Sequence, residues 1–463
     1  MSRLVVVSNR VGNVASNDGQ SGGLAVAVGD ALKERGGLWF GWGGAIGDGD
    51  RVTVAAAEGA SNVTLATVSL SAHDYQNYYL GYANQVLWPL LHYRLDLSRF
   101  EQEFIEAYRR VNRRFASLLM PMLRADDCIW IHDYHLIPLA AELRAQGSEH
   151  AIGFFLHIPF PPRDILVATP QYDWLVRSLF ACDLVGFQTR ADLNNFTRFV
   201  EEEAGGELLS KGRIKAYGRT IVADAFPISI DVRGFTAMAG TVEAQRRVEL
   251  LRRNGLGCSH VIGVDRLDYT KGLPERFRAF GKFLESYPAA RKQVTLMQIA
   301  PPTREEVEAY ADIRHELEAL SGQINGQFGD FHWTPVRYIH RSISRATLAA
   351  LFRGSEVGLV TPLRDGMNLV AKEYVAAQEP SDPGVLILSS FAGAAEELDE
   401  ALIVNPYDLD GVAQALQRAL VMAREERKER HGALMARLAR NDIATWRNRF
   451  LSAMFRAQLG AAA

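Results

Sequence analysis

Short apolar runs recur along this chain, and each one ends in a polar or glycine-rich segment before a helical pattern begins. Such runs are typical of buried strands, because a buried helix needs a longer apolar pattern. Strands that alternate with helices favour parallel sheets with helices packed on both faces. We therefore predict an α/β fold with two parallel sheets, each flanked by helices.

The apolar runs and helical patterns give a map of expected elements. The predicted strands are 3–7, 38–42, 128–131, 152–156, 184–187, 221–227, 261–264, 294–299, 336–339, 357–360, 384–388 and 402–404. Helices are predicted at 23–35, 100–123 and 305–321 and near the C-terminus, and a glycine-rich loop at 9–22. The chain becomes helical and polar after Asp231, so we divide it into domains at 1–232 and 233–444.

Composition excludes several classes of protein. The 51 Lys and Arg residues nearly balance 54 Asp and Glu residues, which leaves a net charge of −3. We therefore expect no nucleic-acid partner and no membrane surface, and any anion site must be local. The three cysteines are far apart, which is typical of free thiols in a reducing cytosol. With no apolar run long enough for a signal peptide or membrane span, we expect a cytoplasmic protein.

The segment 357–378 carries the strongest indication of a ligand. Its strand, 357–360, is followed by Asp365, which we predict as the N-cap of a helix that begins at Gly366. Free amides and the positive end of the helix dipole would meet there, and this environment suits phosphate. Glu373 would lie about 12 Å further along the helix axis. Two carboxylates at that spacing could hold hydroxyl groups on either side of a diphosphate, as in a nucleotide sugar.

Polar residues also follow the other predicted strands, where ligands of α/β sheets collect. The candidates are Ser8, Asn9, Arg10, Gly22, Gly23, His132, Asp133, Tyr134, His135, His157, the segment 265–272 and Arg304. Each of them alone can be an ordinary loop residue. Together they favour a ligand-binding cleft between two sheets.

Arg266 and Lys271 flank a short turn and together could neutralise a diphosphate leaving group. The alternative is a βα loop with ordinary surface charges. Arg10 and Arg304 are candidates for a second anion site. A GxGxxG fingerprint does not follow the first strand, which argues against a dehydrogenase.

The histidines and tyrosines allow two interpretations each. His132, His135 and His157 could bind a metal, but they lack the helical spacing of zinc sites, so hydrogen bonding is the favoured interpretation. Five aromatic residues could stack on a sugar, although core packing is the commoner use of such side chains. They are Tyr75, Tyr78, Tyr79, Tyr82 and Trp88.

With these residues in view, the sequence resembles the bacterial trehalose-6-phosphate synthases, which are retaining glycosyltransferases. The motifs that carry the resemblance are VVVSNR, SGGL, WFGW, LWPLLHYR, IHDYHL, FFLHIPFP, DRLDYTKGLPERF, QIAPPTR and TPLRDGMNLVAKEYVAAQ, which together extend over nearly the whole chain. The resemblance implies a GT-B fold, in which two Rossmann-like, doubly wound parallel-sheet domains face each other across a cleft. It implies no metal or other cofactor, and a last helix, 445–463, that crosses back to the first domain. It also implies transfer of glucose from UDP-glucose to glucose 6-phosphate, and we expect a homo-oligomer, either a dimer or a tetramer.

The resemblance also assigns roles to residues. Arg266, Lys271, Asp365 and His157 would be catalytic, with the two cations on the UDP phosphates and His157 near the 6-hydroxyl of the donor glucose. The full donor set is Gly22, Gly23, Arg266, Lys271, Ile343, Asp365, Gly366, Met367, Asn368, Leu369, Val370, Ala371, Lys372 and Glu373. The acceptor set is Arg10, Tyr79, Trp88, Asp133 and Arg304. Ile343 stands where close relatives often carry Phe beside the uracil, so we expect this contact to use the backbone.

Retention of configuration requires one of two routes. Either a covalent glycosyl-enzyme intermediate forms, or the acceptor attacks the anomeric carbon from the same face from which the leaving group departs. No carboxylate is placed as an obvious nucleophile, and the resemblance implies the second route. We expect the UDP β-phosphate to act as proton acceptor. Three alternatives stay open at this stage. They are a synthase that uses glycerol 3-phosphate as acceptor, a catalytically silent sugar-phosphate sensor, and a metal hydrolase.

Overall fold

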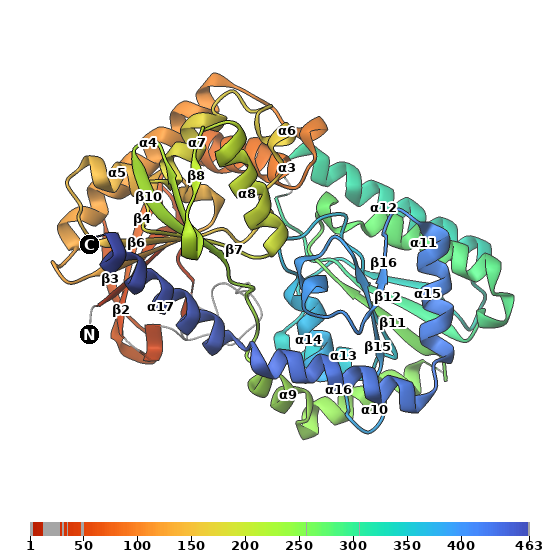
Figure 1. Ribbon diagram of the computed structural model, residues 1–463. Helices are drawn as coiled ribbons and strands as arrows, with labels where there is room; N and C mark the ends of the chain where they lie inside the picture. The colour runs from red at the N-terminus through yellow and green to blue at the C-terminus, as the bar shows by residue number, and fades with distance from the viewer. Residues whose placement is uncertain are drawn as a thin grey trace. The chain divides into compact units, whose positions relative to one another are not determined.

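The computed structural model describes residues 3–12, 28–29, 32–34, 36–47, 51–255, 257–304 and 306–461. They form two compact units (Figure 1). Unit 1 contains the described residues up to Pro227 together with the C-terminal segment from Ala444, and unit 2 runs from Ile228 to Ile443. The chain therefore leaves unit 1 once and returns to it with its last helix. The functional division at 1–232 and 233–444 stays a prediction.

Unit 1 is built on a ten-stranded sheet with the order β3-β4-β2-β1-β5-β6-β7-β10-β9-β8. The strands are β1 (Leu4–Arg10), β2 (Gly37–Ile46), β3 (Thr53–Ala57), β4 (Ala60–Leu70), β5 (Cys128–His132), β6 (Ala151–Phe155), β7 (Leu184–Phe187), β8 (Glu207–Leu208), β9 (Arg213–Ala216) and β10 (Arg219–Ala225). Strands β2, β1, β5, β6, β7 and β10 are parallel, as predicted. Strand β4, which was not predicted, pairs in parallel with β2. Antiparallel partners that the sequence analysis did not predict extend both edges, β3 on one side and β9 with β8 on the other.

Helices cover both faces of this sheet. They are α2 (Ala72–Asp74), the π-helix η1 (Tyr75–Leu87), α3 (Trp88–Leu91), α4 (Gln102–Leu119), α5 (Leu139–Ala145), α6 (Arg163–Leu166), α7 (Tyr172–Leu179), α8 (Arg190–Glu202) and α17 (Ile443–Ala461). Figure 1 shows α4 on one side of the strands and α17, in dark blue, on the other. Phe115 of α4 packs on Phe40 of β2, whereas Phe450 of α17 stacks on Trp130 of β5, whose side chain points to the opposite face.

Glycines in two central strands make room for the returning helix. A Cβ atom on Gly153 of β6 would lie 2.7 Å from Met454 Sδ, and one on Gly186 of β7 would lie 2.6 Å from the Phe450 ring. Both distances are too short for any larger residue. The sequence of unit 1 is therefore adapted to α17, although about 220 residues of the other unit come between (Trp446 and its partner Phe226 are 220 positions apart).

Unit 2 contains a six-stranded sheet with the order β13-β12-β11-β14-β15-β16. All its strands are parallel, as predicted: β11 (Ser259–Val264), β12 (Val294–Ile299), β13 (Val336–Ile339), β14 (Val357–Val360), β15 (Val385–Ser389) and β16 (Leu402–Val404). Counted within the unit, this is the order 3-2-1-4-5-6 of the doubly wound nucleotide-binding fold. The order reverses between β11 and β14.

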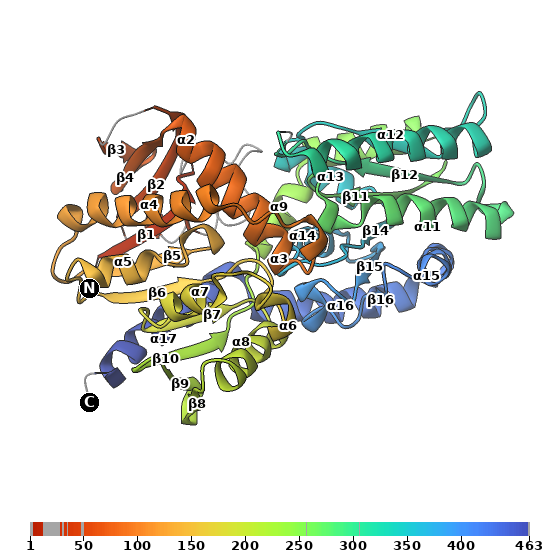
Figure 2. The ribbon, with the colours of Figure 1, turned by 90° about the horizontal axis from the view of Figure 1, so that it is seen from above.

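The helices of unit 2 form a layer on each face of its sheet. They are α9 (Val232–Ala239), α10 (Val242–Asn254), α11 (Leu273–Ser286), α12 (Glu308–Phe328), α13 (Arg345–Arg353), α14 (Leu369–Ala377), α15 (Leu409–Val421) and α16 (Arg424–Arg440). Figure 1 shows α11, α12 and α15 away from α13 and α14, with the strands between the two groups, and Figure 2 shows the same helices from above. Contacts agree, since α11 packs on α12 and α15, and α14 packs on α9, α13 and α16.

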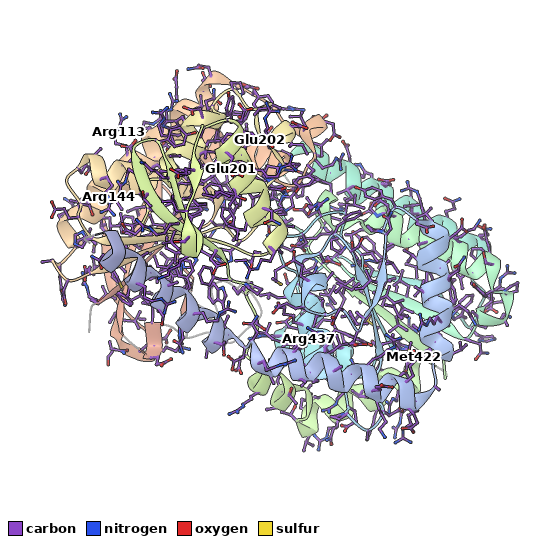
Figure 3. The ribbon with its side chains drawn as sticks, viewed as in Figure 1. Arg113, Arg144, Glu201, Glu202, Met422 and Arg437 are labelled. Carbon is purple, nitrogen blue, oxygen red and sulfur yellow. The ribbon has the colours of Figure 1, made fainter. Side chains whose placement is uncertain are left out.

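Charged side chains occupy the outer surfaces of both units. Arg113, Glu201 and Glu202 of unit 1 and Arg437 of unit 2 are exposed, and Figure 3 labels them. Within the described part of the chain, every helix is too short or too polar to cross a bilayer.

Candidate active site

The carboxyl ends of β11 and β14 lie side by side where the strand order of unit 2 reverses, and this is where such sheets bind ligands. The segment 265–272 follows β11, and 361–368 follows β14. The two segments are joined by the carbonyl of Thr270, which accepts hydrogen bonds from the amides of Leu363 at 2.8 Å and Arg364 at 3.3 Å. The fold thus builds one surface from two stretches that are far apart in sequence.

Lys271 and Asp365 meet on this surface. Lys271 Nζ lies 2.6 Å from Asp365 Oδ2, and both side chains are mostly buried, with 10% and 15% exposure. Asn368 Nδ2 donates to the same carboxylate oxygen at 3.1 Å. The structure therefore brings together two of the predicted site residues and connects them to a third.

The start of α14 differs from the prediction. The helix begins at Leu369, and its N-cap is Asn368, whose Oδ1 accepts a hydrogen bond from the Ala371 amide at 3.1 Å. Asp365 instead forms a β-bridge with Ala392. The Asp365 amide donates to the Phe391 carbonyl at 3.1 Å, and the Asp365 carbonyl accepts from the Gly393 amide at 3.1 Å. The prediction of Asp365 as N-cap and Gly366 as the first helical residue is wrong, because the backbone of Asp365 pairs with the next loop and its carboxylate holds Lys271. The 12 Å separation along one helix does not apply either.

The first turn of α14 presents one partly exposed stripe. Leu369, Val370 and Glu373 lie on it, whereas Ala371 and Lys372 are buried. The amides of Leu369 and Val370 have no partner within the helix, as in any first turn. Glu373 Oε1 lies 3.2 Å from Arg345 Nη2; burial raises the pKa of Glu373, and Arg345 opposes that rise. Two amides and a carboxylate are thus placed on one face of a helix end.

Other members of the predicted donor set are placed differently. Gly366, Met367 and Ala371 are buried, so the side chains of Met367 and Ala371 do not face solvent. Lys372 is fully buried, and its Nζ contacts the Ile228 carbonyl at 2.7 Å and Glu397 Oε2 at 2.5 Å. Any contact of Lys372 with a ligand is therefore left to its backbone. Ile343 is partly exposed in the turn before α13, while Gly22 and Gly23 lie outside the described residues.

Three cations act on one buried carboxylate next to this surface. Asp268 is fully buried, which raises its pKa, but Arg304, Arg266 and Lys271 together hold the pKa below its ordinary value. Arg304 Nη1 lies 3.6 Å from Asp268 Oδ2 and donates to the Tyr310 hydroxyl at 2.7 Å. The three cations predicted for phosphate binding therefore share one corner of unit 2.

A buried arginine that sequence reasoning missed supports the same corner. Arg276 of α11 contacts Asp265 Oδ2 at 2.6 Å and Gln298 Oε1 at 2.8 Å, and its Nε donates to Thr361 Oγ1 at 3.0 Å. It therefore joins the ends of β11, β12 and β14. The available signal was a charge within the apolar stripe of LPERFRAF.

In unit 1, Arg10 and Tyr79 approach each other through Trp42. The Arg10 guanidinium lies 5.1 Å from the centre of the Trp42 ring, and Tyr79 lies 5.4 Å from the same ring. Tyr79 also stacks on His135 at 6.0 Å. Tyr79 is carried by the π-helix η1, a rare form that is often found at functional sites. The sequence analysis did not predict the π-helix, and it did not include Trp42 among the site residues.

Asp133 and His157 follow neighbouring strands, β5 and β6. Asp133 adopts a left-handed conformation (φ 76°), and its Oδ1 accepts a hydrogen bond from the His157 amide at 3.2 Å. The His157 ring lies 3.0 Å (Nε2 to Nδ1) from the ring of His132. Trp88, in contrast, is buried and packs on His92 and Tyr134.

The histidines do not gather around a common centre. His135 stacks on Tyr79 and Tyr134, away from the pair that His132 forms with His157. Among the residues with described positions, no three His, Cys, Asp or Glu side chains are arranged to hold a metal ion.

The sequence model of glycosyltransferase family 20 matches residues 3–456. The chain belongs to this family. One relative in glycosyltransferase family 20 is the trehalose-6-phosphate synthase of Sodalis glossinidius, which is 48% identical over 97% of this chain and 95% of its own length. The family resemblance predicted from the sequence is thereby confirmed.

Solved structures of family members agree over the whole chain. A crystal structure of an α,α-trehalose-phosphate synthase (UDP-forming) from Burkholderia xenovorans in complex with glucose 6-phosphate has a TM-score of 0.94 and 50% identity, with 98% of this chain and 100% of that one covered. An Escherichia coli structure described as bound with UDP-2-fluoro glucose has a TM-score of 0.93 and 47% identity, covering 98% and 99%. The predicted GT-B fold, with two α/β sheets, is confirmed by these similarities.

Proposed function

We propose that this glycosyltransferase transfers the glucosyl group of UDP-glucose to glucose 6-phosphate, giving α,α-trehalose 6-phosphate and UDP. Membership of family 20 supports a glycosyl transfer. The UDP-forming relative with glucose 6-phosphate and the relative with a UDP-glucose analogue support both substrates.

The contact between Lys271 Nζ and Asp365 Oδ2 is the observation that carries the donor side of the proposal. It places a cation beside a carboxylate at the switch point of a nucleotide-binding sheet. Lys271 and Arg266 bind the diphosphate, and Asp365 accepts hydrogen bonds from hydroxyls of the donor glucose. The amides of Leu369 and Val370 add donors at the positive helix end, as do the backbone positions from Gly366 to Lys372. Glu373 accepts the ribose hydroxyls, the Ile343 backbone contacts the base, and Gly22 and Gly23 approach the phosphates.

The acceptor is bound through its phosphate and its hydroxyls. Arg10, Tyr79 and Arg304 are the partners of the phosphate, because a guanidinium matches phosphate oxygens with two parallel hydrogen bonds. Asp133 accepts a hydrogen bond from an acceptor hydroxyl, and Trp88 helps to shape the acceptor pocket. Residues 1–232 with 445–463 thus serve mainly the acceptor, and residues 233–444 serve the donor.

Transfer proceeds with retention and without a covalent enzyme intermediate. The bond from the anomeric carbon to the β-phosphate oxygen breaks, and a bond to the acceptor hydroxyl oxygen forms on the same face. The proton of that hydroxyl passes to the departing β-phosphate. Arg266 and Lys271 stabilise the charge on the departing UDP, and Asp365 and the backbone of His157 lie by the electron-deficient sugar.

Product analysis tests the proposed function. The protein is incubated with UDP-, ADP- and GDP-glucose in turn, with glucose 6-phosphate and glycerol 3-phosphate offered together. The expected product is α,α-trehalose 6-phosphate, formed fastest from UDP-glucose. Glucosylglycerol phosphate as the main product, or hydrolysis without transfer, would overturn the proposal.

We also propose that the reaction needs no metal or other cofactor, because the cationic side chains supply the charge that a metal would supply. Full activity in excess chelator is expected, and activity that chelator abolishes and Mg²⁺ restores would contradict it.

The protein is proposed to act in the cytoplasm, since all three cysteines are free thiols. We also propose that the protein is a homo-oligomer of two or four chains. Sedimentation velocity measures its oligomeric state.

A further inference from the structure

Two histidine rings lie in contact at the carboxyl ends of β5 and β6. His132 Nδ1 and His157 Nε2 are 3.0 Å apart, which is a hydrogen-bond distance. His132 is completely buried, whereas His157 is partly exposed. Aromatic rings surround the pair, with Trp130 centred 4.5 Å from His132, and Phe155 4.7 Å and Trp446 6.3 Å from His157. The apolar surroundings determine which forms of the two rings are stable.

Both rings are neutral at physiological pH. Burial lowers the pKa of His132 well below its ordinary value, and the neighbouring His157 lowers it further. Burial also lowers the pKa of His157, to about 3. One proton is therefore shared across the contact, and one ring must donate while the other accepts.

The remaining nitrogens distinguish the two possible arrangements. Neither His132 Nε2 nor His157 Nδ1 has a hydrogen-bond partner. His132 Nε2 is a buried atom, and His157 Nδ1 is not. If His157 donated from Nε2, the proton of His132 would sit on Nε2, as a buried N–H group without an acceptor. If His132 donates from Nδ1, only a lone pair is left buried. An orphaned buried N–H is rarer in proteins than an under-used acceptor, so the second arrangement is favoured.

We propose that His132 is a positioning residue that holds His157 in the Nδ1–H tautomer. The Nε2 of His157 then accepts from His132, and its solvent-facing Nδ1–H is a permanent hydrogen-bond donor. The backbone of His157 is held as well, because its amide donates to Asp133 Oδ1 at 3.2 Å and its carbonyl accepts from Gln188 Nε2 at 3.3 Å. Ring and backbone are both fixed, so the direction of the donor is fixed too.

A permanent neutral donor selects a ligand oxygen that can accept. Such a group recognises a sugar hydroxyl through its lone pairs and does not remove a proton from it, because Nδ1 already carries one. This assignment of the ligand rests on the proposed function, in which His157 meets a hydroxyl of the donor glucose. The tautomer itself rests only on the contacts of the free protein.

Nuclear magnetic resonance of the full-length, ligand-free protein tests the tautomer directly. With ¹⁵N-labelled histidine, long-range ¹H–¹⁵N correlations report which ring nitrogen carries the proton. We expect His157 to be protonated on Nδ1 and not on Nε2, and His132 likewise. A His157 ring protonated on Nε2, or a doubly protonated ring at pH 7, overturns the proposal whatever the protein catalyses.

Variants test the consequence for binding. His132→Phe removes the donor, and we expect His157 to change to the Nε2–H tautomer and the KM for UDP-glucose to rise about tenfold, the effect of one lost hydrogen bond. His132→Asn keeps an N–H near the Nδ1 position and is expected to retain the tautomer, with KM within about threefold of wild type. His260→Phe is the matched control, because His260 is a buried histidine at the other end of a strand, near the start of β11.

The two proposals can fail separately. If no trehalose phosphate forms, the proposed function fails while the spectrum of the free protein still decides the tautomer. If His132→Phe changes the tautomer but leaves KM unchanged, the role in positioning is overturned. Should His132→Phe fail to fold, the wild-type spectrum and the His132→Asn variant decide alone.

Discussion

At the scale of single residues, the candidate site depends on side chains that are distant in sequence. Lys271 and Asp365 are 94 positions apart, yet their charged atoms lie 2.6 Å from each other. The contact holds a flexible lysine side chain in one direction before any ligand binds. Preorganised charge of this kind stabilises a departing anion without further rearrangement.

Replacing Lys271 by Ala should lower kcat by about 100-fold or more, because the variant loses a charge that stabilises the leaving UDP. Steady-state kinetics with both substrates measures this, and Lys282→Ala, a partly exposed lysine on α11, is the control. A rise in KM for UDP-glucose at unchanged kcat would show that Lys271 binds the donor but does not assist its departure.

Gly44 determines where the Arg10 side chain can lie. A Cβ atom on Gly44 would be 2.4 Å from Arg10 Nη2, and the residue has φ 92°, which disfavours any other side chain. Gly44→Ala is therefore expected to displace Arg10 and to raise the KM for glucose 6-phosphate about tenfold, with little effect on UDP-glucose.

Gly47→Ala is the matched control for that prediction. The added Cβ would lie 3.9 Å from its nearest neighbour, Ser69, so it is accommodated near the same end of β2. Equal effects of the two substitutions on the acceptor KM would contradict the role given to Gly44.

At the scale of elements, the beginning of α14 sets the geometry of the donor surface. Asn368 adopts φ 79°, caps Ala371 and also donates to Asp365. The residue therefore ends the loop, starts the helix and holds the carboxylate that contacts Lys271. The position of the free amides at Leu369 and Val370 follows from this one residue.

Asn368→Ala should destabilise the protein by about 2 kcal/mol, about half from the lost cap and half from the left-handed conformation. The same variant should also raise the KM for UDP-glucose, because Asp365 and the first turn lose their common anchor. Urea unfolding and steady-state kinetics measure the two effects.

Asp408→Ala separates stability from function. Asp408 caps α15 through the Gly411 amide at 2.9 Å, outside the candidate site. This variant should lose a similar cap energy, about 1 kcal/mol, and keep its KM values. A normal KM in Asn368→Ala would argue that the cap is only structural.

At the scale of the whole molecule, the last helix connects the chain end to the first unit. Trp446 of α17 is buried, packs on Trp130 and Phe155, and donates from Nε1 to the Phe226 carbonyl at 3.0 Å. The same indole borders His157. Unit 1 therefore completes its core only after all of unit 2 has been synthesised.

Trp446→Ala is expected to destabilise unit 1 by about 3–5 kcal/mol, as for any large buried aromatic side chain. Hydrogen exchange should become faster in β5 and β6 and stay unchanged in β12. Trp333→Ala, which removes a buried tryptophan bonded to Val294 in unit 2, should give the reverse pattern. Uniform loss of protection in both variants would contradict separate stabilities for the two units.

The strands of unit 2 were predictable because their apolar runs are local, whereas β3, β4, β8 and β9 of unit 1 were not predicted. Val294–Ile299, Val336–Ile339 and Val357–Val360 have the predicted bounds, since a buried parallel strand needs only a few consecutive apolar residues. The π-helix Tyr75–Leu87, which packs against α4, was not predicted, because its residues carry no local pattern that separates a π-helix from an α-helix. The start of α14 was misplaced for a related reason, since Asp365 and Asn368 are both good N-caps and a contact with Ala392 decides between them.

The sequence by itself determined the alternation of strands and helices, the family, and the residue types at the strand ends, because all of these are written in short contiguous motifs. Tertiary structure alone decided which of those residues meet. Lys271 with Asp365, Arg276 with Thr361 and His132 with His157 are pairs from different strands, loops or helices. Only the order of strands in the sheets brings them within hydrogen-bond distance.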